Sequence, residues 1–132
     1  MSLKWAEMIV TYLIAVVDDD ASARDAFAGL VKAFGYMVAV FESGAEFLGA
    51  AENATAACLI ADMQMEQMSG LELFLALTAA GNPVPTILIT AYPDETTRRR
   101  ALKAGVVGFL AKPVDSEALL ACLSKAVGAA GG

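Results

Sequence analysis

The chain has 132 residues, with 15 acidic side chains, 9 basic ones, no histidine and a formal net charge of −6. This length suits one domain that can bury a core of its own. Without histidine the chain can hold neither a His-containing catalytic triad nor an HExxH zinc site. The negative charge argues against direct nucleic-acid binding, because phosphate contacts need clustered Lys and Arg.

The sequence contains no convincing membrane span or export signal. The longest nearly apolar stretch, from Met8 to Val17, is far shorter than the ~20 apolar residues that a spanning helix needs. The three aspartates 18–20 argue against a signal peptide, because they lie between that stretch and a small-residue Ala-Ser-Ala sequence. Cys58 and Cys122 form no CxxC pair and lie in apolar runs, so we expect buried, reduced thiols. The protein is therefore expected to be cytoplasmic, without contact with a membrane.

Short β-rich runs alternate with longer helical ones through the first half of the chain. The apolar run 13–17 predicts a strand that is buried on both faces. Apolar residues at steps of three and four predict a helix over 21–34, which Gly35 ends. Strand-like residues follow at 36–41, then a helix from a Ser43 N-cap to about residue 51, and a third buried strand at 57–61.

The same alternation continues through the second half. A helix begins near Gly70, and a Pro-containing turn at 82–85 precedes a fourth strand at 86–90. The helix predicted over 94–104 has a thin apolar stripe, and a fifth strand at 106–110 and a last helix over 116–127 follow. We expect residues 1–12 to be an N-terminal extension or cloning remnant, 13–127 the single domain, and 128–132 a flexible tail or linker.

Five strands that alternate with five helices predict an α/β fold with a doubly wound parallel sheet. In the flavodoxin-like strand order 2-1-3-4-5, strands one and three are neighbours at the point where the strand order reverses. Ligands of such sheets bind at the carboxyl ends of the strands, near this point. The residues that follow each strand are therefore the candidates for chemistry.

Charged and hydroxyl side chains follow four of the five predicted strands. Asp18 and Asp19 follow strand one, Asp62 follows strand three, Thr90 ends strand four and Lys112 follows strand five. Three converging carboxylates are unfavourable without a cation, and Mg²⁺ (or Mn²⁺) is the natural choice for hard oxygen ligands. A metal, a hydroxyl and a lysine together suit a phosphoryl group, for which a carboxylate can be the nucleophile.

With these residues at the strand ends, the sequence resembles a bacterial response-regulator receiver domain, which has the CheY-like version of this fold. The resemblance covers about 13–127, and residues 17–48 are most similar to receivers of the FixJ type, which usually precede a helix-turn-helix DNA-binding domain. The shared motifs are Asp18-Asp19, Asp62 with Gly70 eight residues later, Thr90-Ala91, Lys103-Ala104-Gly105 and Lys112-Pro113.

The resemblance implies a phosphoacceptor and a metal site. Asp62 matches the phosphorylated aspartate, and Asp18 and Asp19 match the acidic pair that binds Mg²⁺ together with Asp62. The backbone carbonyl of Gln64 matches the remaining protein ligand.

The resemblance also implies the residues that respond to phosphorylation. Thr90 matches the switch hydroxyl, Lys112 the phosphate-contacting lysine, and Phe109 the aromatic side chain that rotates between states. Gln64 and Tyr92 occupy the two positions that tune the rate of phosphate loss, and the bulk of Tyr92 predicts shielding of Asp62 from water.

Two positions depart from the family pattern, and one feature is expected from it. Glu66 replaces the usual proline four residues after the phosphoacceptor, and Ser69 stands where relatives often have Asp or Asn. The peptide bond between Lys112 and Pro113 is expected to be cis.

The function implied is a phosphorylation-dependent switch in two-component signalling and transcription regulation. A sensor histidine kinase or a histidine phosphotransfer protein would supply the phosphoryl group, because the chain has no histidine. Phosphorylation would change which partners bind to the surface of the fourth helix, fifth strand and fifth helix. This surface could also form a homodimer. The domain would not be an enzyme beyond slow loss of its own phosphate.

Two other functions stay open from the residues alone. Asp18 and Asp20 have the spacing of the nucleophile and acid/base pair in haloacid-dehalogenase-type phosphohydrolases, which also use Mg²⁺. The chain could also be a pseudo-receiver that binds partners without phosphorylation. The run Arg98-Arg99-Arg100 is read as a solvated helix face, with partner docking as the alternative.

Overall fold

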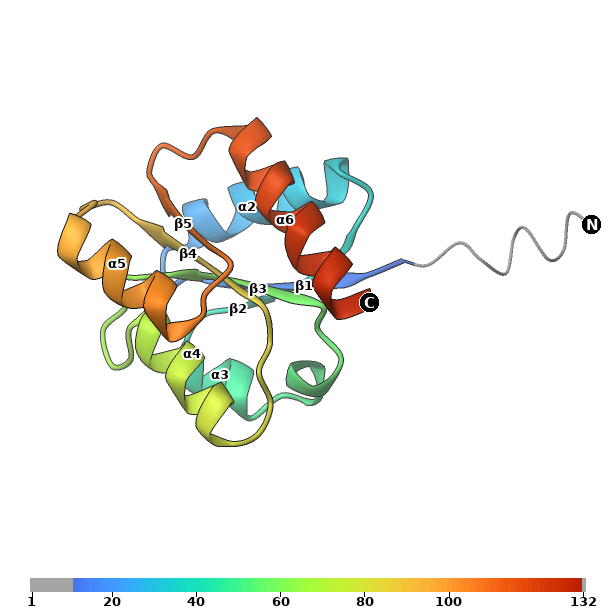
Figure 1. The fold of residues 1–132 in the computed structure, drawn as a ribbon. Coiled ribbons are helices and arrows are strands. Elements are labelled where there is room, and N and C mark those ends of the chain that lie inside the picture. The colour runs from blue at the N-terminus through green and yellow to red at the C-terminus, as the bar shows by residue number, and fades with distance from the viewer. Residues whose placement is uncertain (1–10, 132) are drawn as a thin grey trace, which may run out of the picture.

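The computed structural model describes residues 11–131, which form a five-stranded parallel sheet in the order β2-β1-β3-β4-β5. Helices lie on both faces of this sheet (Figure 1). The predicted fold class and strand order are confirmed. In chain order the elements are β1 (Leu13–Val17), α2 (Ala21–Ala33), β2 (Met37–Phe41), α3 (Gly44–Leu48), the 3₁₀ turn η1 (Ala51–Ala54), β3 (Cys58–Asp62), α4 (Gly70–Ala79), β4 (Thr86–Thr90), α5 (Glu95–Ala104), β5 (Gly108–Ala111) and α6 (Ser116–Gly131).

The strand order reverses between β1 and β3. The chain passes from β1 to β2 on one side and returns to β3, β4 and β5 on the other. The register pairs Val17 with both Phe41 and Ala61, and Asp62 with Ile89. The carboxyl ends of β1, β3 and β4 therefore lie side by side, which brings the residues that follow these strands to one edge.

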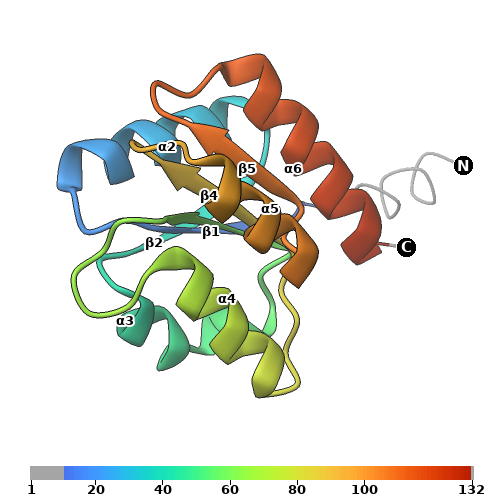
Figure 2. The same ribbon diagram turned by 60° about the vertical axis from the view of Figure 1, so that its left-hand side comes forward.

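The sheet separates two apolar cores. Ile14, Ile60 and Ile87 point toward α2 and α6, and we name this cluster the α2/α6 core. Leu59 and Leu88 point to the opposite face, toward α3, α4 and α5, and we name this cluster the α4/α5 core. Alternate residues of each central strand thus enter different cores, and the two helix layers are visible on either side of the sheet (Figure 2).

Several element boundaries differ from the sequence predictions. The helix after Ser43 ends at Leu48, and a separate 3₁₀ turn follows at Ala51–Ala54. The third strand includes Asp62, and the fifth begins only at Gly108. The last helix was expected to end at Val127, but its backbone continues to Gly131, so residues 128–131 are helical rather than a linker.

Residues at the helix termini set several other element boundaries. Gly35, with a φ of 96°, follows α2 in a conformation that glycine adopts readily. Ser43 accepts a hydrogen bond from the Glu46 N–H, as an N-cap should. Asp20 occupies the N-cap position of α2 but makes no side-chain cap hydrogen bond. Ser69 forms a reciprocal capping box with Glu72 at the start of α4.

The structure tests only part of the predictions for the N-terminal residues and the two thiols. The predicted extension at 1–12 lies outside the described residues except for residues 11 and 12, which precede β1. Cys58 is buried, whereas Cys122 is only partly buried, and both are free thiols. No helix among residues 11–131 has the length and apolarity needed to cross a membrane.

Candidate functional site

Three carboxylates meet at the edge formed by the ends of β1 and β3. One oxygen from each of Asp18, Asp19 and Asp62 lies within 4.8 Å of the other two. Asp18 is 1% exposed and Asp62 is 6% exposed, while Asp19 is open to solvent. The reversal of strand order therefore brings together the three aspartates that the sequence placed at strand ends. Asp20 is not part of this group.

Lys112, directly after β5, supplies the nearby positive charge. Its Nζ lies 3.7 Å from Asp18 Oδ2 and 3.5 Å from Asp62 Oδ1. A hydrogen bond from the Lys112 N–H to the Thr90 carbonyl keeps the residue beside the end of β4. The peptide bond between Lys112 and Pro113 is cis, as expected.

One lysine does not balance two buried carboxylates. Burial raises the pKa of Asp18 above its ordinary value, against the lowering effects of the Asp20 N–H and Lys112. Burial also raises the pKa of Asp62, and the negative charge of Asp18 adds to this effect. Asp18 Oδ2 and Asp62 Oδ1 are buried and accept no hydrogen bond from any described residue. Two such oxygens beside a third carboxylate are the donor set that a divalent cation with oxygen ligands fits.

Thr90, the last residue of β4, is linked to the loop after β3. Thr90 is 1% exposed, and its hydroxyl donates to Gln64 Oε1 at 3.1 Å. The Tyr92 N–H donates to the same hydroxyl at 3.0 Å. Thr90 therefore lies at the same edge of the sheet as the loop after β3, as predicted. The contact between the Gln64 side chain and Thr90 was not predicted, because spacing in the sequence does not show side-chain direction.

Comparison with known proteins decides the family. Residues 14–124 match the model of the response regulator receiver domain. The chain belongs to this family.

Relatives of known name agree with this assignment. The receiver is 37% identical over 114 residues to the transcriptional regulatory protein TdiR of Thauera aromatica, covering 86% of this chain and 50% of TdiR. It is 32% identical over 114 residues to the transcriptional regulatory protein FixJ of Bradyrhizobium diazoefficiens, covering 86% of this chain and 56% of FixJ. The chain thus spans about half the length of these relatives.

Solved structures give the same result. The structure of the response regulator StyR matches with a TM-score of 0.84 and 35% identity, over 92% of this chain and 62% of that one. The crystal structure of FixJ-N matches with a TM-score of 0.82 and 29% identity, over 91% and 96% of the two chains. Receiver domains are signalling domains, and the named relatives are transcriptional regulators, so the resemblance to FixJ-type receivers is confirmed.

Arg24 of the receiver is a site residue whose role was missed from the sequence. Its Nη1 donates to the Asp18 backbone carbonyl at 2.9 Å, and its Nη2 lies 3.7 Å from Glu42. Arg24 thereby joins α2 to the ends of β1 and β2, and it holds the backbone at Asp18. The signal was its place one turn into the helix that follows the aspartates.

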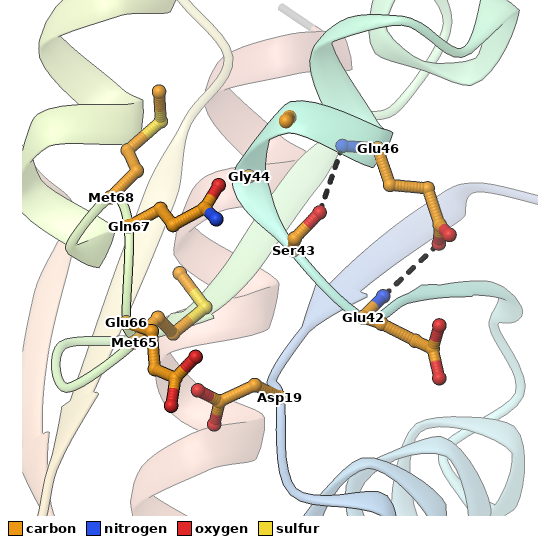
Figure 3. Close-up of a pocket in the computed structure, with 10 residues that line it drawn as sticks. Asp19, Glu42, Ser43, Gly44, Glu46, Met65, Glu66, Gln67 and Met68 are labelled. Atoms are coloured by element: carbon orange, nitrogen blue, oxygen red, sulfur yellow. Dashed lines mark hydrogen bonds between the residues drawn. The ribbon is translucent and has the colours of Figure 1, made fainter.

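A cleft of about 560 Å³ borders the carboxylates through Asp19 (Figure 3). Glu66, which replaces the usual proline, lines this cleft, and its carboxylate lies opposite that of Asp19 in Figure 3. Met65 and Met68 line the cleft and also pack against the α4/α5 core, as does Met63, so these methionines fill space under the loop.

Phe109 and Tyr92 lie on the α5 side of the receiver. Phe109 is partly buried against the α4/α5 core and lines a second cleft of about 300 Å³ with Arg98 and other residues of the α5 region. Tyr92 is 75% exposed. That exposure gives no support to the prediction that its ring shields Asp62 from water.

Proposed function

We propose that this receiver is a phosphorylation switch in which Asp62 accepts a phosphoryl group from a phosphohistidine. The observation that carries the proposal is the pair of buried carboxylate oxygens on Asp18 and Asp62, which accept no hydrogen bond from the described residues and share the single positive charge of Lys112. A purely structural carboxylate of such burial would have its oxygens hydrogen-bonded. The partner would be a sensor histidine kinase or a histidine phosphotransfer protein, because this chain has no histidine.

Mg²⁺ or Mn²⁺ fits the carboxylate group on chemical grounds. Asp18, Asp19 and Asp62 would hold it through carboxylate oxygens, and the backbone carbonyl of Gln64 would complete the protein ligands. When bound, the cation supplies positive charge that offsets the carboxylates and the phosphoryl oxygens.

The transfer itself needs little from the protein beyond placement. An Asp62 carboxylate oxygen forms a bond to phosphorus as the bond from phosphorus to the donor imidazole nitrogen breaks, and that nitrogen keeps the electron pair. Lys112 Nζ lies close enough to Asp62 to pair with a phosphoryl oxygen on it. The Thr90 hydroxyl would donate a hydrogen bond to another of these oxygens.

The response would spread to the surface of α5, β5 and α6. The phosphoryl group adds about −1.5 to −2 charge at the carboxylates, and movement of Thr90 would leave space that Phe109 can fill. This surface would then change its partners, including a second receiver as a homodimer. The protein would act in the cytoplasm as part of transcription regulation, with slow loss of its own phosphate as its only turnover.

The first prediction concerns the phosphoacceptor. Asp62→Asn should abolish labelling by acetyl phosphate with Mg²⁺, because an amide oxygen is a poor nucleophile. Intact-mass measurement should show one added phosphoryl group on the wild type and none on the variant. Asp25→Asn is the matched control, since Asp25 is an exposed residue of α2, and it should label fully.

The other outcomes separate the alternatives. Labelling of Asp62→Asn at wild-type stoichiometry overturns the assignment of Asp62. Steady turnover of a phosphomonoester that is lost in Asp18→Asn would favour the phosphohydrolase. A wild-type protein that takes neither phosphoryl groups nor beryllofluoride would be a pseudo-receiver.

A further inference from the structure

The loop between β3 and α4 places one side-chain amide against the end of β4. Gln64 Oε1 accepts hydrogen bonds from the Thr90 hydroxyl at 3.1 Å and from the Ala91 N–H at 3.2 Å. Gln64 Nε2 lies 2.9 Å from the same hydroxyl. The Ala91 N–H can only donate, so it fixes which end of the amide is the oxygen. The Gln64 side chain is therefore held in one orientation.

The same residue also reaches the phosphoacceptor through its backbone. The Gln64 backbone acts to lower the pKa of Asp62, against the larger effect of burial. Gln64 thus connects the carboxylate of β3 to the hydroxyl of β4 within one residue. Its backbone faces Asp62, whereas its side chain faces Thr90.

The two partners differ in burial, which decides how the contact can break. Gln64 is exposed, while Thr90 is 1% exposed. A buried hydroxyl needs a partner, and leaving it unpaired is unfavourable. The amide of Gln64 can turn into solvent without opening the core, provided that another acceptor takes the Thr90 proton.

We propose that Gln64 is a positioning residue that holds the Thr90 hydroxyl in the unphosphorylated protein and competes with the phosphoryl group for it. The inference rests on the proposed function, in which a phosphoryl oxygen on Asp62 is the other acceptor. The amide oxygen accepts from Thr90 as a phosphoryl oxygen would. Part of the favourable contact to Thr90 is therefore already present before phosphorylation, and this weakens binding of a phosphoryl group or its mimic.

This role differs from tuning the rate of phosphate loss. Competition changes an equilibrium, so it acts on the affinity for beryllofluoride, a phosphoryl mimic that is not hydrolysed. A net hydrogen bond between neutral groups corresponds to roughly a three- to tenfold change in affinity. The backbone carbonyl of Gln64, the expected metal ligand, is unchanged by any side-chain substitution.

The experiment compares two glutamines of the same loop. Gln64→Leu and Gln67→Leu make the same chemical change, and both side chains are exposed. Each protein is titrated with beryllofluoride at saturating Mg²⁺ and followed by amide NMR. The apparent Kd should fall about three- to tenfold in Gln64→Leu and stay at the wild-type value in Gln67→Leu. Before any addition, the Ala91 amide proton should exchange faster only in Gln64→Leu.

A second pair of variants shows that the effect passes through Thr90. In a Thr90→Val background the gain from Gln64→Leu should largely disappear, because there is no hydroxyl left to release. Equal affinity of Gln64→Leu and wild type overturns the inference, as does the same gain in both backgrounds. If the wild type binds no beryllofluoride, the proposed function fails and this inference fails with it. If Asp62→Asn loses labelling but Gln64→Leu shows no gain in affinity, the proposed phosphorylation switch is supported and the inference about Gln64 is overturned.

Discussion

Asp18 and Asp62 are carboxylates that the fold buries at a cost to its own stability. Burial raises the pKa of both, so the folded protein binds protons more tightly than the unfolded chain between about pH 4 and the raised values. The free energy of unfolding therefore falls as pH rises through this interval. The residues that would carry the function are thus residues that destabilise the metal-free domain.

The second prediction tests this cost. Asp18→Asn should raise the Tm of the metal-free protein at neutral pH by roughly 3 °C, or ~1 kcal/mol, because it removes a buried charge next to Asp62. The gain should shrink as the pH falls toward about pH 4, because the raised pKa lets the wild-type carboxyl take up its proton above that pH. Thermal melts in a chelator measure both, with Asp25→Asn as the control. A lower Tm for Asp18→Asn throughout the pH range would contradict the prediction.

The third prediction also concerns Asp18 and Asp62. With Mg²⁺ present, the wild type should become more stable than Asp18→Asn. Added Mg²⁺ should raise the Tm of the wild type, since a ligand at about 100 times its Kd stabilises the fold by ~2.7 kcal/mol. The same addition should shift Asp18→Asn much less, because a carboxylate donor is lost. Equal shifts in the two proteins would show that Mg²⁺ does not bind through Asp18.

At the scale of elements, the close approach of α4 to β3 positions Asp62, the proposed phosphoacceptor. A Cβ at Gly70 would lie 2.7 Å from the Asp62 carbonyl oxygen and 2.8 Å from Leu88 Cδ2. The first turn of α4 therefore rests directly on the end of β3, and the capping box at Ser69 fixes where that turn begins.

The fourth prediction uses two glycines in different places. Gly70→Ala should destabilise the fold by about 1–3 kcal/mol and lower acetyl-phosphate labelling severalfold, because the backbone at Asp62 must shift. Gly29→Ala, in the exposed part of α2 with no atom within 4 Å of the added Cβ, should instead stabilise by up to ~1 kcal/mol. Urea unfolding and labelling rates measure both. A Gly70→Ala protein of wild-type stability would show that the helix can move away freely.

The helices and strands also show how much of the structure could be predicted from the sequence. The hydrophobic pattern predicted each strand. The strand order came from the flavodoxin-like fold, and with that order the carboxyl ends of the strands predicted that Asp18, Asp62 and Lys112 lie together. The break between α3 and η1 and the extension of α6 were missed, since alanine-rich segments have no clear end signal. The contacts of Gln64 and Arg24 were missed because they depend on side-chain directions in loops.

At the scale of the whole molecule, the sheet separates two helix layers, and each layer packs against a different set of strand residues. Leu88 belongs to the α4/α5 core, and Thr90, two residues later on the same strand, shares its face. Phe109 packs against the same core. The α2/α6 core on the other face contains Ile87 and Ile89 but not these residues.

The fifth prediction follows from this division. Beryllofluoride with Mg²⁺ should change amide-exchange protection in β5 and α5, because Phe109 of β5 lies on the same face of the sheet as Thr90 of the neighbouring β4. The amides in the middle of α2 should keep their protection. Hydrogen exchange with peptide-level mass readout measures both regions in one sample. Equal changes in α2 and α5 would show that the rearrangement is global.

The division of the core by the sheet also bears on how such a protein can change through evolution. Substitutions among the side chains between α2 and the sheet can adjust the stability of the fold without touching the face that holds Thr90. Substitutions behind α5 can adjust the response while the other layer preserves the fold. The two faces of the sheet therefore offer separate places for substitutions that alter stability and for substitutions that alter the proposed response.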